Sequence, residues 1–202
     1  MEAQMANTLE QRRDDLRNTR KRNIKIELVQ FCIALGLHYL CILEFALKYA
    51  MSIRRLEIKN LTKDRQSLVE LARRAALSAY APYSGFKVGA AVLMSDGTVY
   101  TGNNQENAAY GQSVCAERVA LLYAQAQKPG VAPEAVAIAA IENGCLTTSP
   151  VTPCGACRQV FAETEQRYGR PVEILMTGED VILSADSASD LLPCAFSSDT
   201  IK

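Results

Sequence analysis

The 202-residue sequence has one histidine, no net charge, no internal repeat and no low-complexity tract. These absences exclude repeat arrays and compositionally biased chains. With 49% hydrophobic and 22% charged residues, the composition is typical of a soluble globular protein. The length allows one domain with a substantial core but not two full ones. The single histidine, His38, lies in an apolar stretch, so we expect it in a core or interface rather than at a metal.

The lack of net charge conceals a difference between the two parts of the chain. Residues 1–65 contain 13 Lys and Arg against 8 Asp and Glu, whereas residues 66–202 contain 9 against 14. A protein that binds DNA or RNA needs a basic surface to neutralise phosphates. The larger, later part is acidic, which disfavours a nucleic-acid partner.

No disulfide framework is expected, because the seven cysteines are odd in number and spread along the chain. This use of cysteine is typical of a cytoplasmic protein, in which most thiols are small apolar side chains. Four cysteines fit that description: Cys32, Cys41, Cys145 and Cys194.

The sequence also lacks an apolar run of the roughly 20 residues that cross a bilayer as a helix. A basic segment, residues 11–25, precedes sixteen mostly apolar residues, 28–43, as in a signal or anchor, but no convincing cleavage site follows. Met51 could itself start a compact protein of residues 51–202. We interpret residues 1–50 as an N-terminal extension that is dispensable or reflects a misassigned start. A partner-binding helix and a membrane anchor are the alternatives.

From residue 64 onward, helical and strand patterns alternate. Leu68, Leu71 and Ala75 recur at helical spacing, and the predicted helix ends before Pro82. The alternation predicts a three-layer α/β/α domain around a mixed five-stranded sheet, with an extra N-terminal helical segment. The other expected helices cover residues 115–127, 155–167 and 187–192. The expected strands are 86–94, 98–100, 135–141, 172–176 and 181–185.

Three cysteines occur in two motifs that indicate a zinc site, Cys115-Ala-Glu-Arg and Pro-Cys154-Gly-Ala-Cys157. Each motif falls where a loop becomes a helix, and a helix N-terminus favours the thiolate that binds zinc. Three thiolates predict one Zn²⁺ per chain with a fourth position open, the arrangement of catalytic zinc. The Cys-x-x-Cys pair alone would equally suit a redox dithiol. The additional Cys-x-Glu motif favours zinc.

Glu117 lies two residues from a predicted ligand, where a carboxylate can carry protons without binding the metal. A ligand-x-Glu motif followed by Pro-Cys-x-x-Cys is the recorded pattern of zinc deaminases. The sequence further resembles the small homotetrameric cytidine deaminases over about residues 65–201. The resemblance also rests on residues 80–91, 104–110 and 191–196.

The resemblance implies roles for further residues. The residues matching Asn104 and Glu106 hydrogen-bond the ribose hydroxyls, and that matching Phe86 packs on the base. The residue matching Arg118 hydrogen-bonds the ligand thiolates, and its charge would offset their excess negative charge. The substrate-binding set expected from the resemblance is Phe86, Asn104, Glu106, Ala108, Tyr110 and Phe196.

The resemblance also implies a homotetramer with shared active sites. The aromatic residue matching Phe196 closes the pocket of a neighbouring subunit, and that matching Tyr110 reaches across an interface. One departure is Cys194, where relatives often have glycine, and no role is assigned to it.

The predicted function is zinc-dependent deamination of cytidine and deoxycytidine to uridine and deoxyuridine plus ammonia, as in pyrimidine salvage. The sequence does not rank the two substrates. The alternative is a nucleoside-analogue deaminase of the blasticidin type. Four residues argue against it: Arg118, Phe86, Asn104 and Glu106. A polynucleotide-editing enzyme would need a basic, aromatic-lined channel, which the acidic region lacks. A non-enzymatic zinc protein would not need Glu117. We expect a small-molecule partner, with neither nucleic acid nor a membrane.

Overall fold

A computed structural model describes residues 53–201. The predicted N-terminal helical segment, the boundary at residue 50, His38, Cys32 and Cys41 lie outside this range. None of the helices in the described part of the chain combines the length and the apolar composition needed to cross a membrane.

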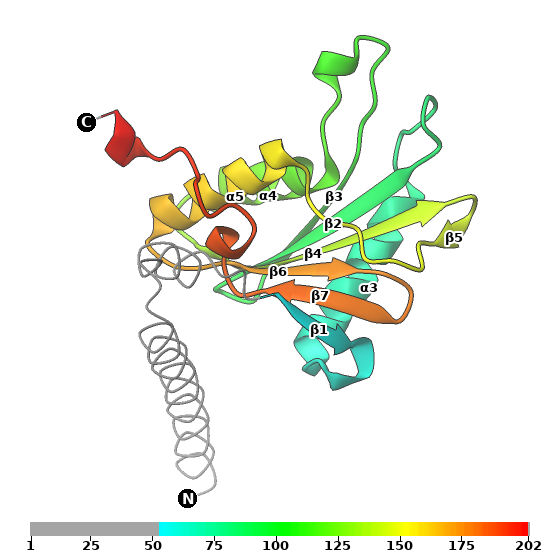
Figure 1. The fold of residues 1–202 in the computed structure, drawn as a ribbon, viewed down its shortest axis with the longest axis horizontal. Coiled ribbons are helices and arrows are strands. Elements are labelled where there is room, and N and C mark those ends of the chain that lie inside the picture. The colour runs from blue at the N-terminus through cyan, green and yellow to red at the C-terminus, as the bar shows by residue number, and fades with distance from the viewer. Residues whose placement is uncertain (1–52, 202) are drawn as a thin grey trace, which may run out of the picture. The chain divides into compact units, whose positions relative to one another are not determined.

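Seven strands form one mixed sheet within residues 53–201, in the order β1-β7-β6-β4-β2-β3 with β5 beside β4 (Figure 1). The pair β4–β6 is parallel, and the other pairs among these strands are antiparallel. The strands are β1 (Arg54–Glu57), β2 (Lys87–Met94), β3 (Val99–Asn103), β4 (Pro133–Glu142), β5 (Cys145–Leu146), β6 (Glu173–Thr177) and β7 (Val181–Ala185).

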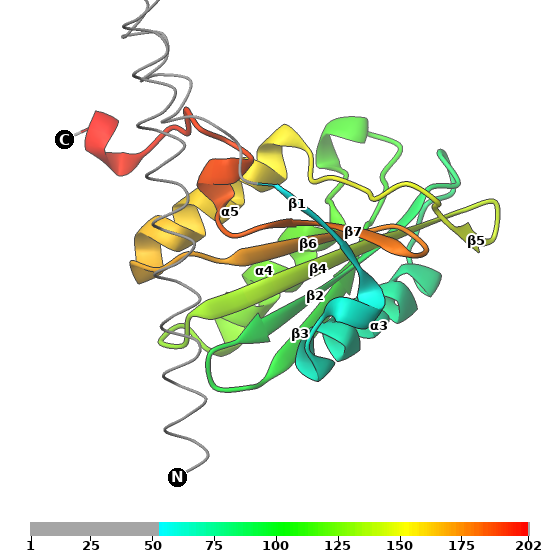
Figure 2. The same ribbon diagram turned by 60° about the horizontal axis from the view of Figure 1, so that its bottom comes forward.

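Helices cover both faces of the sheet, which confirms the predicted mixed α/β class (Figures 1 and 2). The alternation along β2 shows why, since Ala90 and Val92 belong to the core beneath two helices while Ala91 belongs to the core beneath the third. The first core includes α4 (Ala116–Gln127) and α5 (Gly155–Tyr168), and the second includes α3 (Lys63–Leu77).

The five predicted strands are all present, and the sheet has two more. Strand β1 has four residues, too few for a clear sequence pattern, and it is a strand because it pairs with the edge of β7. Strand β5 has two residues in a segment that the sequence predicts as loop. A turn at Asn143 (φ 52°) and Gly144 (φ 81°) folds it back onto β4. Two successive residues with positive φ are typical of a tight hairpin turn.

The helices α4 and α5 lie side by side in a constant register. The buried side chain of Gln125 donates to Thr164 Oγ1 over 3.0 Å, and Tyr168 donates to the carbonyl of Pro129. Each pair joins residues that are 39 positions apart. The two helices therefore run in the same direction, and their first turns start together.

Glycine allows the sheet to approach its helices closely. A Cβ at Gly89 of β2 would collide with the backbone of Ala72 and Ala76 in α3. A Cβ at Gly102 of β3 would lie 2.5 Å from the backbone nitrogen of Ala120 in α4. These contacts involve main-chain atoms, which cannot move aside as a flexible side chain can.

Gly89→Ala is therefore expected to lower the free energy of unfolding by about 3 kcal/mol, the upper range for overpacking a core. The matched control is Gly130→Ala, since nothing lies within 4 Å of a Cβ there. Urea denaturation of both variants measures the effect. Equal stability of the two would contradict this account of the packing.

Candidate functional site

The three cysteines of the two sequence motifs form one cluster. Cys115 and Cys154 are the residues immediately before α4 and α5, and Cys157 lies in the first turn of α5. The sulfur of Cys154 is 3.6 Å from that of Cys115 and 3.5 Å from that of Cys157, and all three are within 4.8 Å of one another.

This geometry fits zinc. Ligands placed tetrahedrally around Zn²⁺ with bonds of about 2.3 Å lie about 3.8 Å apart, close to the sulfur separations observed here. Neither Cys115 nor Cys154 uses its side chain to cap its helix. Their sulfurs thus remain available to a metal, and the positive ends of two helices meet at the cluster.

The thiols differ in acidity. Hydrogen bonding with the Cys157 thiol, then with the Cys154 thiol, and the charge of Arg118 lower the pKa of Cys115 to about 6. The same bond to Cys115 and burial raise the pKa of Cys157. The first thiolate therefore forms at Cys115, and Cys157 is protonated at neutral pH until a metal replaces its proton.

Glu117 lies beside the cluster and is not one of the three grouped ligands. Its side chain is 5% exposed, and burial, followed by the nearby Cys115, raises the pKa of its carboxyl group. A carboxyl group in such surroundings can hold and release a proton near neutral pH better than an exposed one. The hydrogen bond expected between Arg118 and the ligand thiolates is not present among residues 53–201. The charge of Arg118 nevertheless lowers the pKa of Cys115.

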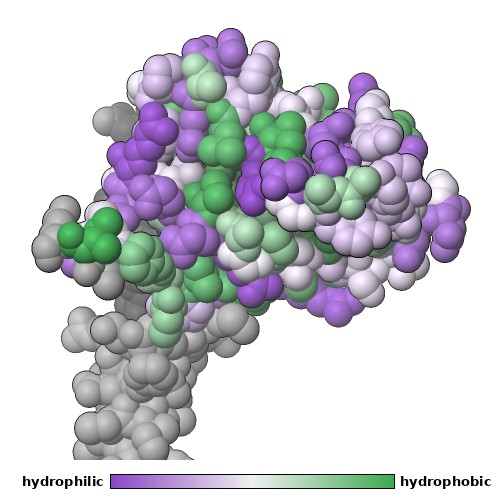
Figure 3. Space-filling view, turned by 90° about the horizontal axis from the view of Figure 1, so that it is seen from above, coloured by the Kyte–Doolittle hydropathy of each residue, from purple (hydrophilic) through white to green (hydrophobic). Residues whose placement is uncertain are grey.

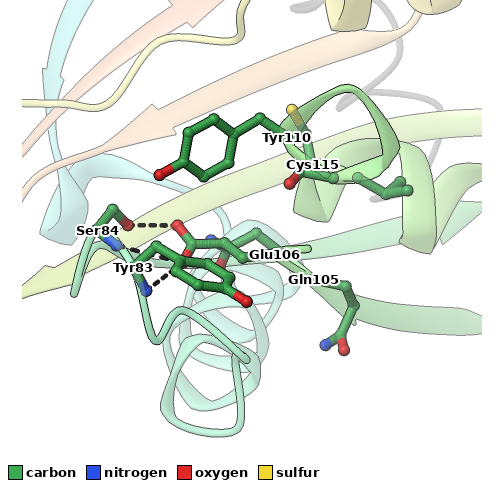
Figure 4. Close-up of a pocket in the computed structure, with 9 residues that line it drawn as sticks. Tyr83, Ser84, Gln105, Glu106, Tyr110 and Cys115 are labelled. Atoms are coloured by element: carbon green, nitrogen blue, oxygen red, sulfur yellow. Dashed lines mark hydrogen bonds between the residues drawn. The ribbon is translucent and has the colours of Figure 1, made fainter. Parts of the chain in front are cut away.

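A pocket of about 300 Å³ opens next to Cys115. Figure 4 shows the Glu106 carboxylate turned toward Ser84, with Tyr110 and Cys115 on the other side of the pocket. The Tyr83 and Tyr110 rings meet edge to face, with their centroids 6.0 Å apart. The lining residues are Tyr83, Ser84, Asn104, Gln105, Glu106, Tyr110, Ser113, Val114 and Cys115.

Two of the predicted substrate residues are held firmly in this pocket. Asn104 accepts from the amide of Val88 over 2.7 Å and donates to the carbonyl of Phe86 over 3.0 Å. Glu106 Oε2 accepts from the amides of Tyr83 and Ser84, at 2.9 and 3.3 Å. Its Oε1 accepts from the Ser84 hydroxyl over 2.5 Å. The Ser84 hydroxyl, followed by the Tyr83 amide, lowers the pKa of Glu106, so this carboxylate is ionised.

Comparison with known proteins agrees with this site. Residues 62–168 match the model of the cytidine and deoxycytidylate deaminase zinc-binding region. The chain belongs to the cytidine deaminase family.

Relatives in this family align with most of the described residues. The chain is 43% identical over 136 residues to a cytidine deaminase of Halalkalibacterium halodurans, covering 67% of this chain and 96% of the relative. It is 40% identical over 139 residues to that of Sporosarcina psychrophila, covering 68% and 95%. A crystal structure of cytidine deaminase from Burkholderia pseudomallei is 42% identical with a TM-score of 0.56, covering 67% of this chain and all of that one. The zinc-binding region and the three grouped thiols identify Zn²⁺ as the cofactor.

Three residues of the expected substrate-binding set, Phe86, Ala108 and Phe196, do not line the pocket in this family member. Phe196 belongs to a C-terminal segment along α5, where the residue is 61% exposed. The side chain of Gln159 makes two hydrogen bonds with the backbone of Phe196, donating to its carbonyl over 2.7 Å and accepting from its amide over 3.3 Å. Gln166, seven positions later on α5, accepts from the amide of Ser198 and donates to its hydroxyl.

Sequence reasoning assigned no role to five of the lining residues, of which Ser84 makes the most hydrogen bonds through its side chain. The available signal was the turn Pro82-Tyr83-Ser84-Gly85, in which Gly85 has φ of 69°. A hydroxyl beside a turn glycine is common, and nothing nearby in the sequence marks Glu106, 22 positions away, as its partner. The missed lining residues are Tyr83, Ser84, Gln105, Ser113 and Val114.

Binding of Zn²⁺ to the metal-free protein at pH 7.5 is expected to release at least one proton per ion, because the raised pKa of Cys157 leaves that thiol protonated. Calorimetric titrations in buffers of different ionisation enthalpy measure the number released. Cys154→Ser should weaken zinc binding, and the matched control Cys145→Ser, at an exposed cysteine outside the cluster, should not. Heats independent of the buffer, or equal weakening by both substitutions, would argue against this cluster.

Proposed function

We propose that the chain hydrolyses the exocyclic amino group of cytidine and deoxycytidine, giving uridine or deoxyuridine and ammonia. The observation that carries this proposal is the three-thiol cluster with Glu117 beside it, next to a pocket lined by Asn104 and Glu106. No observation favours a blasticidin-type enzyme.

The chemistry requires a water molecule to add at C4 of the base and an amine to leave. Zn²⁺ held by Cys115, Cys154 and Cys157 supplies electrophilic activation of that water. Glu117 takes a proton from the attacking water and delivers it to ring N3. The same carboxyl group then takes the remaining proton of the hydroxyl added at C4 and delivers it to the departing amino group, so that the carbonyl of uridine forms as ammonia leaves. Burial suits Glu117 to this exchange, because it raises the pKa of the carboxyl group. Arg118 offsets part of the negative charge of three thiolates.

The hydrogen bonds already made in the pocket limit which sugar groups it can recognise. One Asn104 hydrogen is used by Phe86, so one remains to be donated. Both acceptor positions of Glu106 Oε2 are used by amides and one of Oε1 by Ser84, so one acceptor position remains. Asn104 Oδ1 uses one of its two acceptor positions for the Val88 amide, so one also remains there. The free hydrogen of Asn104 and the free position on Glu106 Oε1 can together hold one hydroxyl group, which accepts from Asn104 and donates to Glu106.

We assign this position to the 3′-hydroxyl, because deoxycytidine, which lacks the 2′-hydroxyl, is a predicted substrate. Recognition of one hydroxyl explains how a single pocket accepts both sugars. The proposal therefore requires that a substrate keep its 3′-hydroxyl group.

We further propose that the protein forms a homotetramer with shared active sites. We also propose that it acts in pyrimidine salvage in the cytoplasm. Exposed apolar surface supports the assembly, since Tyr110 is 74% exposed and Phe196 61%. Figure 3 shows apolar residues in a strip between polar ones on one face. Phe196 does not line the pocket of its own chain, which is consistent with a role at a neighbour's site. The free thiols among the described residues are consistent with a reducing compartment.

Glu117→Gln is expected to reduce kcat for cytidine by about 10²- to 10⁴-fold, the usual contribution of a general acid and base. The change in ultraviolet absorbance as cytidine becomes uridine measures turnover, and metal analysis should find one Zn²⁺ per chain in both proteins. Turnover undiminished in the variant would remove Glu117 from the mechanism. No turnover by the zinc-loaded wild type would refute the cytidine assignment.

The substrate 3′-deoxycytidine should be converted with a kcat/KM at least about tenfold lower than that of cytidine, because one hydrogen bond to a charged acceptor is lost. For 2′-deoxycytidine, kcat/KM should stay within a few-fold of the cytidine value. Competition experiments with the three nucleosides measure these ratios. A larger penalty for the missing 2′-hydroxyl would reverse the assignment.

A further inference from the structure

The side-chain hydroxyl of Ser84 joins two groups of the predicted substrate site. Its Oγ lies 3.0 Å from the amide nitrogen of Phe86 and 2.5 Å from Glu106 Oε1. Ser84 also lines the pocket. One hydroxyl group thus links the residue expected beneath the base to the carboxylate expected at the sugar.

The direction of each hydrogen bond follows from the chemistry of the groups. The Phe86 amide can only donate, so the Ser84 oxygen accepts there. The single hydroxyl proton of Ser84 is then free to be donated to Glu106, which as an ionised carboxylate can only accept. Neither bond can reverse, so the Ser84 hydroxyl is fixed in orientation on both sides.

The acceptor positions of the Glu106 carboxylate show where a substrate hydroxyl could bind. Its Oε2 is used fully by the amides of Tyr83 and Ser84, and the remaining acceptor position is on Oε1. A sugar hydroxyl would therefore share Oε1 with Ser84. We propose that Ser84 is a positioning residue that orients Glu106 Oε1 for one sugar hydroxyl of the substrate; this rests on the proposed deaminase function.

The fold of the loop itself does not require this hydroxyl. The amide of Gly85 donates to the carbonyl of Ala81 over 3.1 Å, which closes the turn through backbone atoms. Tyr80 and Glu106 are also joined by backbone, since the Glu106 amide donates to the Tyr80 carbonyl over 2.9 Å. Ser84 is exposed, and its Ala variant is expected to fold.

The test combines Ser84→Ala with substrates that keep or lack the 3′-hydroxyl. For cytidine, Ser84→Ala should lower kcat/KM about tenfold, mainly through KM, as expected when one hydrogen bond to a charged group is lost. For 3′-deoxycytidine the same substitution should change kcat/KM less than about twofold, because the hydroxyl that Glu106 would bind is already missing. Ser84→Thr keeps the hydroxyl and should restore most of the cytidine activity.

The matched control is Ser113→Ala. Ser113 lines the same pocket and accepts from the amide of Asn107, but it has no hydrogen bond to Glu106 among the described residues. Ser113→Ala should change kcat/KM for cytidine and for 3′-deoxycytidine by the same factor.

An equal penalty of Ser84→Ala on both nucleosides would overturn the proposal, since it would mean a general role in the loop. Unchanged kinetics would overturn it as well. If Ser84→Ala binds no zinc or unfolds, Ser84→Cys replaces it, because a thiol keeps the size but donates weakly. The wild-type protein is assayed first. If the zinc-loaded wild type does not turn over cytidine, the deaminase function itself is refuted, independently of any Ser84 variant.

Discussion

The constant register between α4 and α5 is the constraint on which the rest of the site depends. Cys115 and Cys154 are 39 positions apart, as are Gln125 and Thr164, which pair ten residues further along the two helices. Two helices that run together in this way keep their first turns at the same place. The sulfurs therefore meet without any long side chain having to reach for the metal, and both helix N-termini face the charge that they stabilise.

The register is maintained by close packing on one face of the sheet. Small residues along α4, including Ala116, Ala120 and Ala124, are fully buried against the strands. Gly102 lets β3 approach the same helix at its backbone. This packing also buries Glu117, so the contacts that align the cysteines also raise the pKa of its carboxyl group. The packing of α4 on the sheet thus serves both the stability of the fold and the proposed site.

Local patterns in the sequence predicted much of this arrangement. The helical spacing of Leu68 and Ala75 predicted α3, and the two cysteine motifs predicted the metal cluster, because each signal lies within one turn or one helix. The partners of Asn104 and Ser84 could not be predicted in this way. Asn104 was expected to be available to the sugar, yet two of its hydrogen-bonding positions hold the backbone of Val88 and Phe86. Such bonds depend on loops that only the folded chain brings together.

The C-terminal segment illustrates a different kind of attachment. Gln159 binds the main chain of Phe196, and Gln166 binds the main-chain amide and the hydroxyl of Ser198. A segment held mostly through its peptide groups places few demands on the side chains that it carries. Cys194 is exposed just before this attachment, so exchange between glycine and cysteine there leaves the attachment intact. The side chain of Cys194 can therefore differ without disturbing the helix that begins at the zinc-binding cysteines, whereas the same attachment keeps the exposed Phe196 at a constant position.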